Sequence, residues 1–142
     1  MTKIDFFSNA PNRLDYVIRL LKKVQGAKQT VVVYGEENTL NALSDALWQQ
    51  DGFCAHDVYH EQNPTTLVAD IVLVSSIPNQ FPHHSNLINL TDSLPDFFAA
   101  FTRLIEVVPA DEAPRQAARE RWLHYKSRGY VMSHHDIAAK NA

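Results

Sequence analysis

Two uninterrupted runs of apolar residues constrain the fold of this chain more than any other feature. The sequence reads TVVVY at residues 30–34 and IVLVS at residues 71–75. A strand with one solvated face alternates apolar and polar residues, whereas a strand covered on both faces is apolar throughout. Both runs therefore predict buried strands of the kind found in a parallel sheet that lies between layers of helices.

Helical patterns separate these strands. Apolar positions recur at helical spacing between Asn12 and Gly26, between Glu36 and Gly52, and from about Pro114 to Arg128. The sequence also predicts a strand at 3–8, a weaker strand at 53–58, a short strand at 87–90, a short helix at 95–101, and either a strand or a helix at 103–108. Alternating strands and helices predict an α/β fold: a single-domain, Rossmann-like, open and mostly parallel sheet with helices on both faces.

The chain has 142 residues, which is the size of one ordinary domain. The last predicted helix ends before Gly129, and the residues after Tyr130 are polar and rich in His and Ala. We therefore expect one α/β domain over residues 1–130 and a polar C-terminal tail over residues 131–142. Loss of that tail is expected to be tolerated.

The cysteine content and the hydropathy of the sequence indicate the cellular compartment. Cys54 is the single cysteine, so an internal disulfide and a multi-thiolate zinc site are both excluded. The N-terminus lacks a basic segment followed by an apolar stretch, and no run of 18 apolar residues occurs. These features predict a cytoplasmic protein without a membrane segment.

The motifs of nucleotide-dependent and metal-dependent enzymes are missing. The chain has only four glycines, and neither a glycine-rich phosphate loop nor a Gly-Lys-Ser/Thr sequence follows a predicted strand. No two histidines lie four residues apart within a predicted helix, where they could share one face. Cys54 and His56 could share a strand face, although a small buried thiol is the simpler interpretation. We expect no cofactor, no metal and no catalytic residue.

Basic charge is concentrated in the last predicted helix. Arg115, Arg119 and Lys126 fall within about 40° of one another around the helix axis, with Trp122 beside them. Residues 111–130 carry five basic and three acidic side chains, a balance of +2 in a chain of net charge -3. A guanidinium pair beside an aromatic ring suits an acidic peptide or a C-terminal carboxylate. A simple solvated helix face is the alternative.

Several motifs along the chain carry a resemblance to a known family. They are FF at 6–7, ALW at 46–48 followed by FxxH at 53–56, the aromatic segment 97–101 leading into VVP at 107–109, and QAARERWxxYxxxGY at 116–130. In this order they resemble the chi subunit of bacterial DNA polymerase III over essentially the whole chain. The most specific part is the arginine-glutamate-arginine-aromatic sequence of the last helix.

The resemblance implies a non-catalytic accessory subunit of the clamp-loader complex, with a Rossmann-like fold that binds no nucleotide. Such an adaptor pairs with the psi subunit, and it grips the acidic C-terminal tail of the single-stranded-DNA-binding protein, so that DNA is contacted only indirectly. The family's tail site corresponds here to Arg119 for the terminal carboxylate, Arg115 as a second cation, and Trp122, Trp48 and Phe53 around the pocket. Helical geometry adds Lys126 to this set.

Two other hypotheses stay open at this point. A small α/β enzyme would bind nucleotide or zinc, and either ligand would then raise the melting temperature of the folded protein. An adaptor for a different partner, such as a helicase that docks in place of psi, would have the same sequence features.

Overall fold

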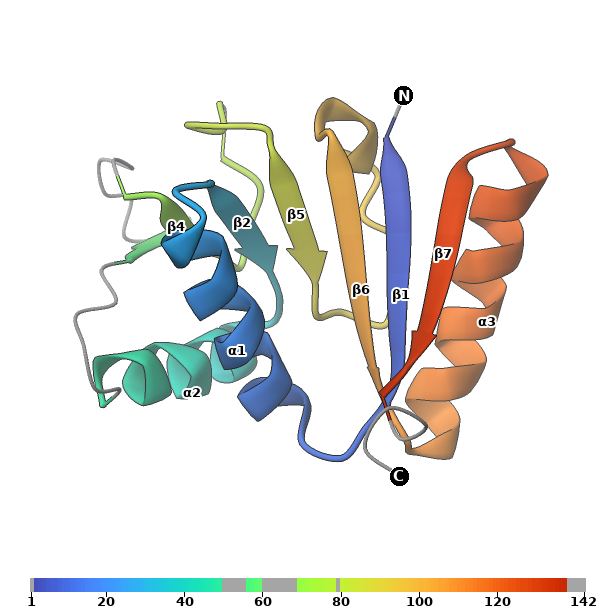
Figure 1. Cartoon of the computed structure of the whole chain (residues 1–142), viewed down its shortest axis with the longest axis horizontal. Helices are drawn as coiled ribbons and strands as arrows, with labels where there is room; N and C mark the ends of the chain where they lie inside the picture. Colours follow the sequence, from blue (N-terminus) through green and yellow to red (C-terminus); the bar gives the residue numbers. More distant parts are fainter. Residues whose placement is uncertain (1, 50–55, 60–68, 79, 138–142) are drawn as a thin grey trace.

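The computed structural model describes residues 2–49, 56–59, 69–78 and 80–137, which form one seven-stranded sheet. All strand pairs are parallel, and the order is β3-β4-β2-β5-β6-β1-β7 (Figure 1). The strands are β1 (Lys3–Ala10), β2 (Val31–Tyr34), β3 (Asp57–Tyr59), β4 (Ile71–Val74), β5 (Asn86–Asn89), β6 (Arg103–Pro109) and β7 (Val131–Asp136). The helices are α1 (Arg13–Gly26), α2 (Glu37–Trp48), α3 (Glu112–Ser127) and the short 3-10 helix η1 (Phe98–Ala100). The predicted open parallel sheet is confirmed.

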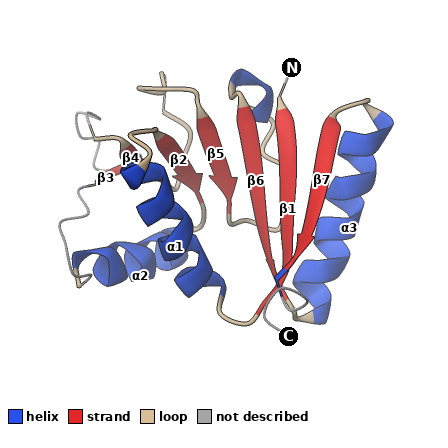
Figure 2. Ribbon diagram, in the orientation of Figure 1, coloured by secondary structure: helices blue, strands red, loops and turns tan. Residues whose placement is uncertain are grey.

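Helices cover both faces of the sheet, as predicted (Figure 2). Successive strand residues point to opposite faces, so Val31 and Val33 of β2 pack in the cluster that contains α1 and α2, while Val32 packs in the cluster that contains α3. All three valines are completely buried. The continuous apolar runs of β2 and β4 thus reflect strands that are covered on both sides.

The segment at 103–109, which the sequence leaves open between strand and helix, is a strand. It lies between β5 and β1 near the middle of the sheet, and five of its seven residues are buried. Its apolar side chains pack on the two faces of the sheet. Ile105 and Val107 pack on the α1 side, and Leu104 and Val108 pack on the α3 side. The predicted helix at 95–101 shrinks to the single turn η1.

The end of the chain departs from the prediction. Residues 131–136, expected to belong to a polar tail, form the edge strand β7, which pairs with β1 from Lys3 to Ser8. Ile137 follows it and is buried in the cluster on the α1 face. An edge strand keeps part of its surface in water, so its side chains can be polar and carry no apolar alternation. That composition made the strand look like a tail.

The connection from α3 to β7 depends on one glycine. Gly129 has φ +79, a left-handed conformation that a side chain would strain. The chain therefore reverses directly after α3, and β7 returns alongside the helix (Figure 1). Among the described residues, no helix is both long and apolar enough to span a bilayer.

Candidate functional site

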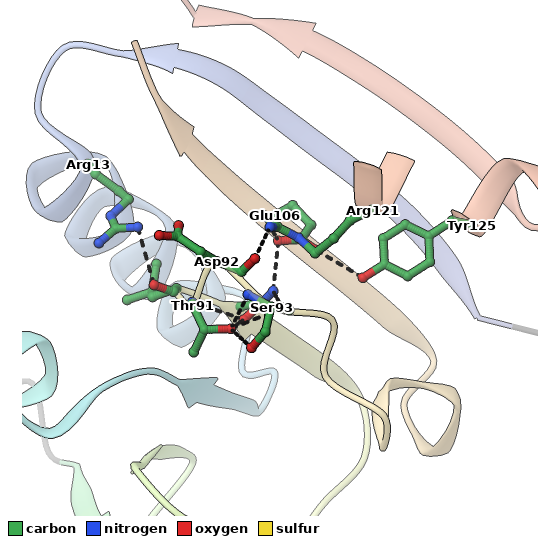
Figure 3. A network of polar contacts seen from close by, with 9 residues as sticks. Arg13, Thr91, Asp92, Ser93, Glu106, Arg121 and Tyr125 are labelled. Atoms are coloured by element: carbon green, nitrogen blue, oxygen red, sulfur yellow. Dashed lines mark hydrogen bonds and ion pairs between the residues drawn. The ribbon is translucent and has the colours of Figure 1, made fainter. Parts of the chain in front are cut away.

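A buried polar network fixes α3 against the sheet (Figure 3). Glu106 of β6 is completely buried, and its carboxylate accepts hydrogen bonds from Arg121 Nε at 3.0 Å and Nη2 at 3.2 Å. The Tyr125 hydroxyl donates to the same carboxylate at 3.0 Å, and so does Asn89 Nδ2 from β5 at 3.0 Å. Arg121 Nη1 also donates to the Asp92 carbonyl at 2.9 Å. The Glu106 carboxylate therefore joins β5, β6 and α3, and Arg121 extends the network to the loop at Asp92.

The electrostatics of this network are those of a buried ion pair. Burial raises the pKa of the Glu106 carboxyl, and the Arg121 guanidinium beside it acts in the opposite direction. Burial also raises the pKa of the Tyr125 hydroxyl far above its ordinary value, and the Glu106 charge adds to the increase. Tyr125 therefore remains a hydrogen-bond donor at any physiological pH.

This network divides the two arginines of the sequence RERW at 119–122 between the inside and the outside of the molecule. Arg121 is 6% exposed and faces the sheet, while Arg119 is exposed to solvent. The surface of α3 is therefore less positive than the sequence alone suggests, because the charge of Arg121 is paired with Glu106 in the interior. Arg115 and Arg119 lie one helical turn apart on the outer side.

A pocket of about 400 Å³ lies beside the central turns of α3, toward the carboxyl ends of β1 and β7. The last residues of both strands and one residue near the end of β6 form its wall on the sheet side. Its lining consists of Phe6, Ser8, Asn9, Val108, Arg115, Ala118, Arg119, Trp122, His134 and Asp136.

One wall of the pocket is apolar and aromatic. Trp122 packs edge-on against Phe6, with ring centroids 5.1 Å apart and planes at 76°. Val108 and Ala118, both buried, continue this wall. The combination can receive an apolar side chain and exclude water from around it.

The rest of the lining is polar and includes two guanidinium groups and one carboxylate. Arg115 is half-buried and Arg119 exposed, and within the described part of the chain neither guanidinium forms an ion pair. Across from the helix, His134 Nε2 and Ser8 Oγ lie 2.6 Å apart and share a hydrogen bond. Two guanidinium groups at the edge of an apolar hollow can bind one or more carboxylates.

The structure brings together only some of the residues that the sequence predicts for the site. Arg115, Arg119 and Trp122 all line the pocket. Lys126 is exposed one turn beyond Trp122 and does not line the pocket.

Of the other two predicted residues, Trp48 does not line the pocket, and Phe53 lies outside the described residues. Trp48 ends α2 on the opposite face of the sheet, where its ring lies 4.5 Å from that of His56. The structure therefore does not bring Trp48 to the arginines. Helical spacing could not reveal this, because Trp48 belongs to a different helix.

Four polar lining residues were missed from the sequence, namely Ser8, Asn9, His134 and Asp136, and so were the apolar Phe6, Val108 and Ala118. Two of the polar residues end β1, where Asn9 adopts φ 57, a left-handed conformation that asparagine tolerates better than most residues. The only available signal was the turn sequence after strand one. His134 and Asp136 belong to the strand that the sequence failed to reveal.

The histidines make no metal centre in the described part of the chain. No group of three or more His, Cys, Asp and Glu side chains gathers there in a way that could hold a metal ion. His56 shares a hydrogen bond with Ser44 at 2.7 Å. Cys54, weighed above as its partner, lies outside the described residues.

Comparison with known proteins gives one consistent result. Residues 1–133 match the family model described as DNA polymerase III chi subunit, HolC. The chain is 29% identical to DNA polymerase III subunit chi of Pseudomonas aeruginosa, over 96% of this chain and 98% of that protein. It is 26% identical to subunit chi of Haemophilus influenzae, over 80% and 78% of the two chains, and 26% identical to subunit chi of Escherichia coli, over 77% and 74%.

Proposed function

Because this chain belongs to the DNA polymerase III chi subunit family, we propose that it is a non-catalytic adaptor subunit of the replicative polymerase. In this proposal it joins the clamp-loader complex through the psi subunit. It also captures the acidic C-terminal tail of the single-stranded-DNA-binding protein, and so connects the polymerase to coated single strands without holding DNA itself.

The pocket beside α3 is the observation that carries this proposal. A protein tail that ends in phenylalanine offers a free carboxylate, further carboxylates upstream, and an apolar ring. The pocket offers two guanidinium groups without an ion-pair partner among the described residues, next to the aromatic and aliphatic wall of Trp122, Phe6 and Val108. The chemistry of tail and pocket is complementary in both charge and hydrophobicity.

The two arginines have different parts in this binding mode. Arg119, on the RERW sequence, would bind the terminal carboxylate, since the bidentate guanidinium fork matches a carboxylate. Arg115, one turn earlier, would take an upstream carboxylate. Lys126 lies outside the pocket and would act only through long-range attraction, which salt screens.

Fluorescence anisotropy with a labelled acidic peptide that ends in a free phenylalanine tests this proposal. We expect the free-acid peptide to bind and its C-terminal amide to bind far more weakly. Arg119→Ala should nearly abolish binding, because the bound peptide would bury the guanidinium–carboxylate pair, and truncating one partner of a buried pair costs about 2–5 kcal/mol. Lys126→Ala is the matched control on the same helix, and it should weaken binding only at low salt.

Two results would contradict the proposal. Equal binding of acid and amide peptides would show that no terminal carboxylate is recognised. Equal losses for Arg119→Ala and Lys126→Ala at both low and physiological salt would show that the pocket does not distinguish its own arginine from a neighbouring cation. Urea unfolding of each variant provides the check that the fold is intact.

A further inference from the structure

His134 faces the arginines across the pocket from the opposite element. It lies on β7, and its ring contacts Trp122 of α3 edge-on, with centroids 6.1 Å apart and planes at 72°. The residue is exposed, so its ring is accessible to solvent and to a bound molecule. Any ligand that fills the pocket between α3 and β7 would contact this imidazole.

The hydrogen bond to Ser8 holds the ring in place in either protonation state. His134 Nε2 and Ser8 Oγ are 2.6 Å apart. A serine hydroxyl both donates and accepts, so Ser8 can donate to a neutral ring or accept from a protonated one. Nδ1 has no hydrogen-bond partner among the described residues. A protonated ring therefore carries a free N–H donor and a positive charge at the pocket wall.

The charged groups around His134 come from two elements. Arg115 and Arg119 approach from α3, and Asp136 lies two residues further along β7 on the same face of the sheet. The remaining neighbours, Ser8 on β1 and Trp122 on α3, are neutral. A carboxylate bound between α3 and β7 would face both guanidinium groups on one side and this imidazole on the other.

We propose that His134 is a third cationic contact for the acidic peptide, one that binds a carboxylate only when its imidazole is protonated. This inference rests on the proposed function, and it adds a pH dependence to peptide capture that the two arginines cannot produce. Histidine changes its charge between about pH 5 and 8, while arginine stays charged and the peptide carboxylates stay ionised throughout that range.

The experiment repeats the anisotropy titration with the free-acid peptide at pH 6 and pH 8 at constant ionic strength. For the wild type, we expect the dissociation constant to be about two- to fivefold lower at pH 6, the range of an exposed ion pair. His134→Gln should lose this ratio and bind as the wild type does at pH 8. His134→Lys should bind with the higher affinity at both values. His135→Gln, next in sequence but on the opposite face of the sheet, should keep the wild-type ratio.

The outcomes separate the two proposals. If the wild type does not bind the peptide at either pH, the proposed function is wrong and the role of His134 is wrong with it. If the peptide binds and His134→Gln keeps the wild-type pH ratio, only the role of His134 is overturned. Loss of the ratio in His135→Gln instead of His134→Gln would also overturn it.

Discussion

At the scale of single residues, the Glu106–Arg121 pair decides how α3 is held. Glu106 is completely buried, and Arg121 provides the positive charge beside it. We expect Arg121→Met to lower the free energy of unfolding by about 3–5 kcal/mol at pH 8, since the carboxylate would stay buried without a counter-charge. Urea unfolding measures the difference. Arg119→Met is the matched control, because the same exchange at an exposed position leaves no buried charge.

The loss in Arg121→Met should depend on pH. Burial raises the pKa of Glu106, and the variant lacks the guanidinium that opposes this increase. A carboxyl whose folded pKa is raised contributes stability below its unfolded pKa, and that contribution disappears as pH rises through the folded pKa. The deficit relative to wild type should therefore be smaller at pH 5 than at pH 8. A deficit that does not change with pH, or an equal deficit in Arg119→Met, would contradict this account.

At the scale of elements, β7 determines whether the pocket exists. It pairs with β1 over six residues, supplies His134 and Asp136 to the pocket, and leads to the buried Ile137. We expect a chain that ends at Tyr130 to lose peptide binding. Its loss of stability should exceed the ~2–5 kcal/mol typical of truncating one buried isoleucine to alanine. Urea unfolding and peptide anisotropy measure the two effects.

A chain that ends at Ile137 is the control for this truncation, because it retains every strand pair of β7. It should unfold at a higher urea concentration than the chain that ends at Tyr130, and it should bind the peptide. Equal midpoints for the two truncated chains would show that β7 contributes nothing to the fold. This outcome would restore the original expectation of a dispensable tail.

At the scale of the whole molecule, the net charge is consistent with the proposed binding of an acidic peptide without direct binding of DNA. The chain has a net charge of -3, while the pocket gathers two arginines on one side of α3. Non-specific DNA binding needs an extended basic surface that neutralises many phosphates. We expect a labelled oligothymidine to show no saturable binding, at physiological salt, at protein concentrations that saturate the peptide.

Anisotropy under identical conditions compares the two ligands. A Glu112→Lys, Glu120→Lys double variant, which adds basic charge to α3, tests whether overall charge is the reason and should gain oligonucleotide binding at low salt. Saturable binding of the oligonucleotide to the wild type, with an affinity that falls steeply as salt rises, would contradict the indirect contact with DNA.

Local periodicity in the sequence was sufficient for much of this protein. The apolar runs at 30–34 and 71–75 fixed two strands as buried on both faces, and with the helical patterns between them they predicted the parallel α/β sheet. The spacing of Arg115, Arg119 and Trp122 placed them on one side of α3. All of these inferences concern residues within one element, where the backbone repeat alone decides which side chains share a face.

The tertiary structure decided what lies opposite those faces. It turned Arg121 inward to Glu106, placed Trp48 across the sheet from the arginines, and made 131–136 a strand that brings His134 to the pocket. None of this follows from periodicity, because it depends on the order of the strands and on which element pairs at the edge. A polar edge strand half in water leaves no apolar repeat in the sequence, so only its pairing with β1 reveals it.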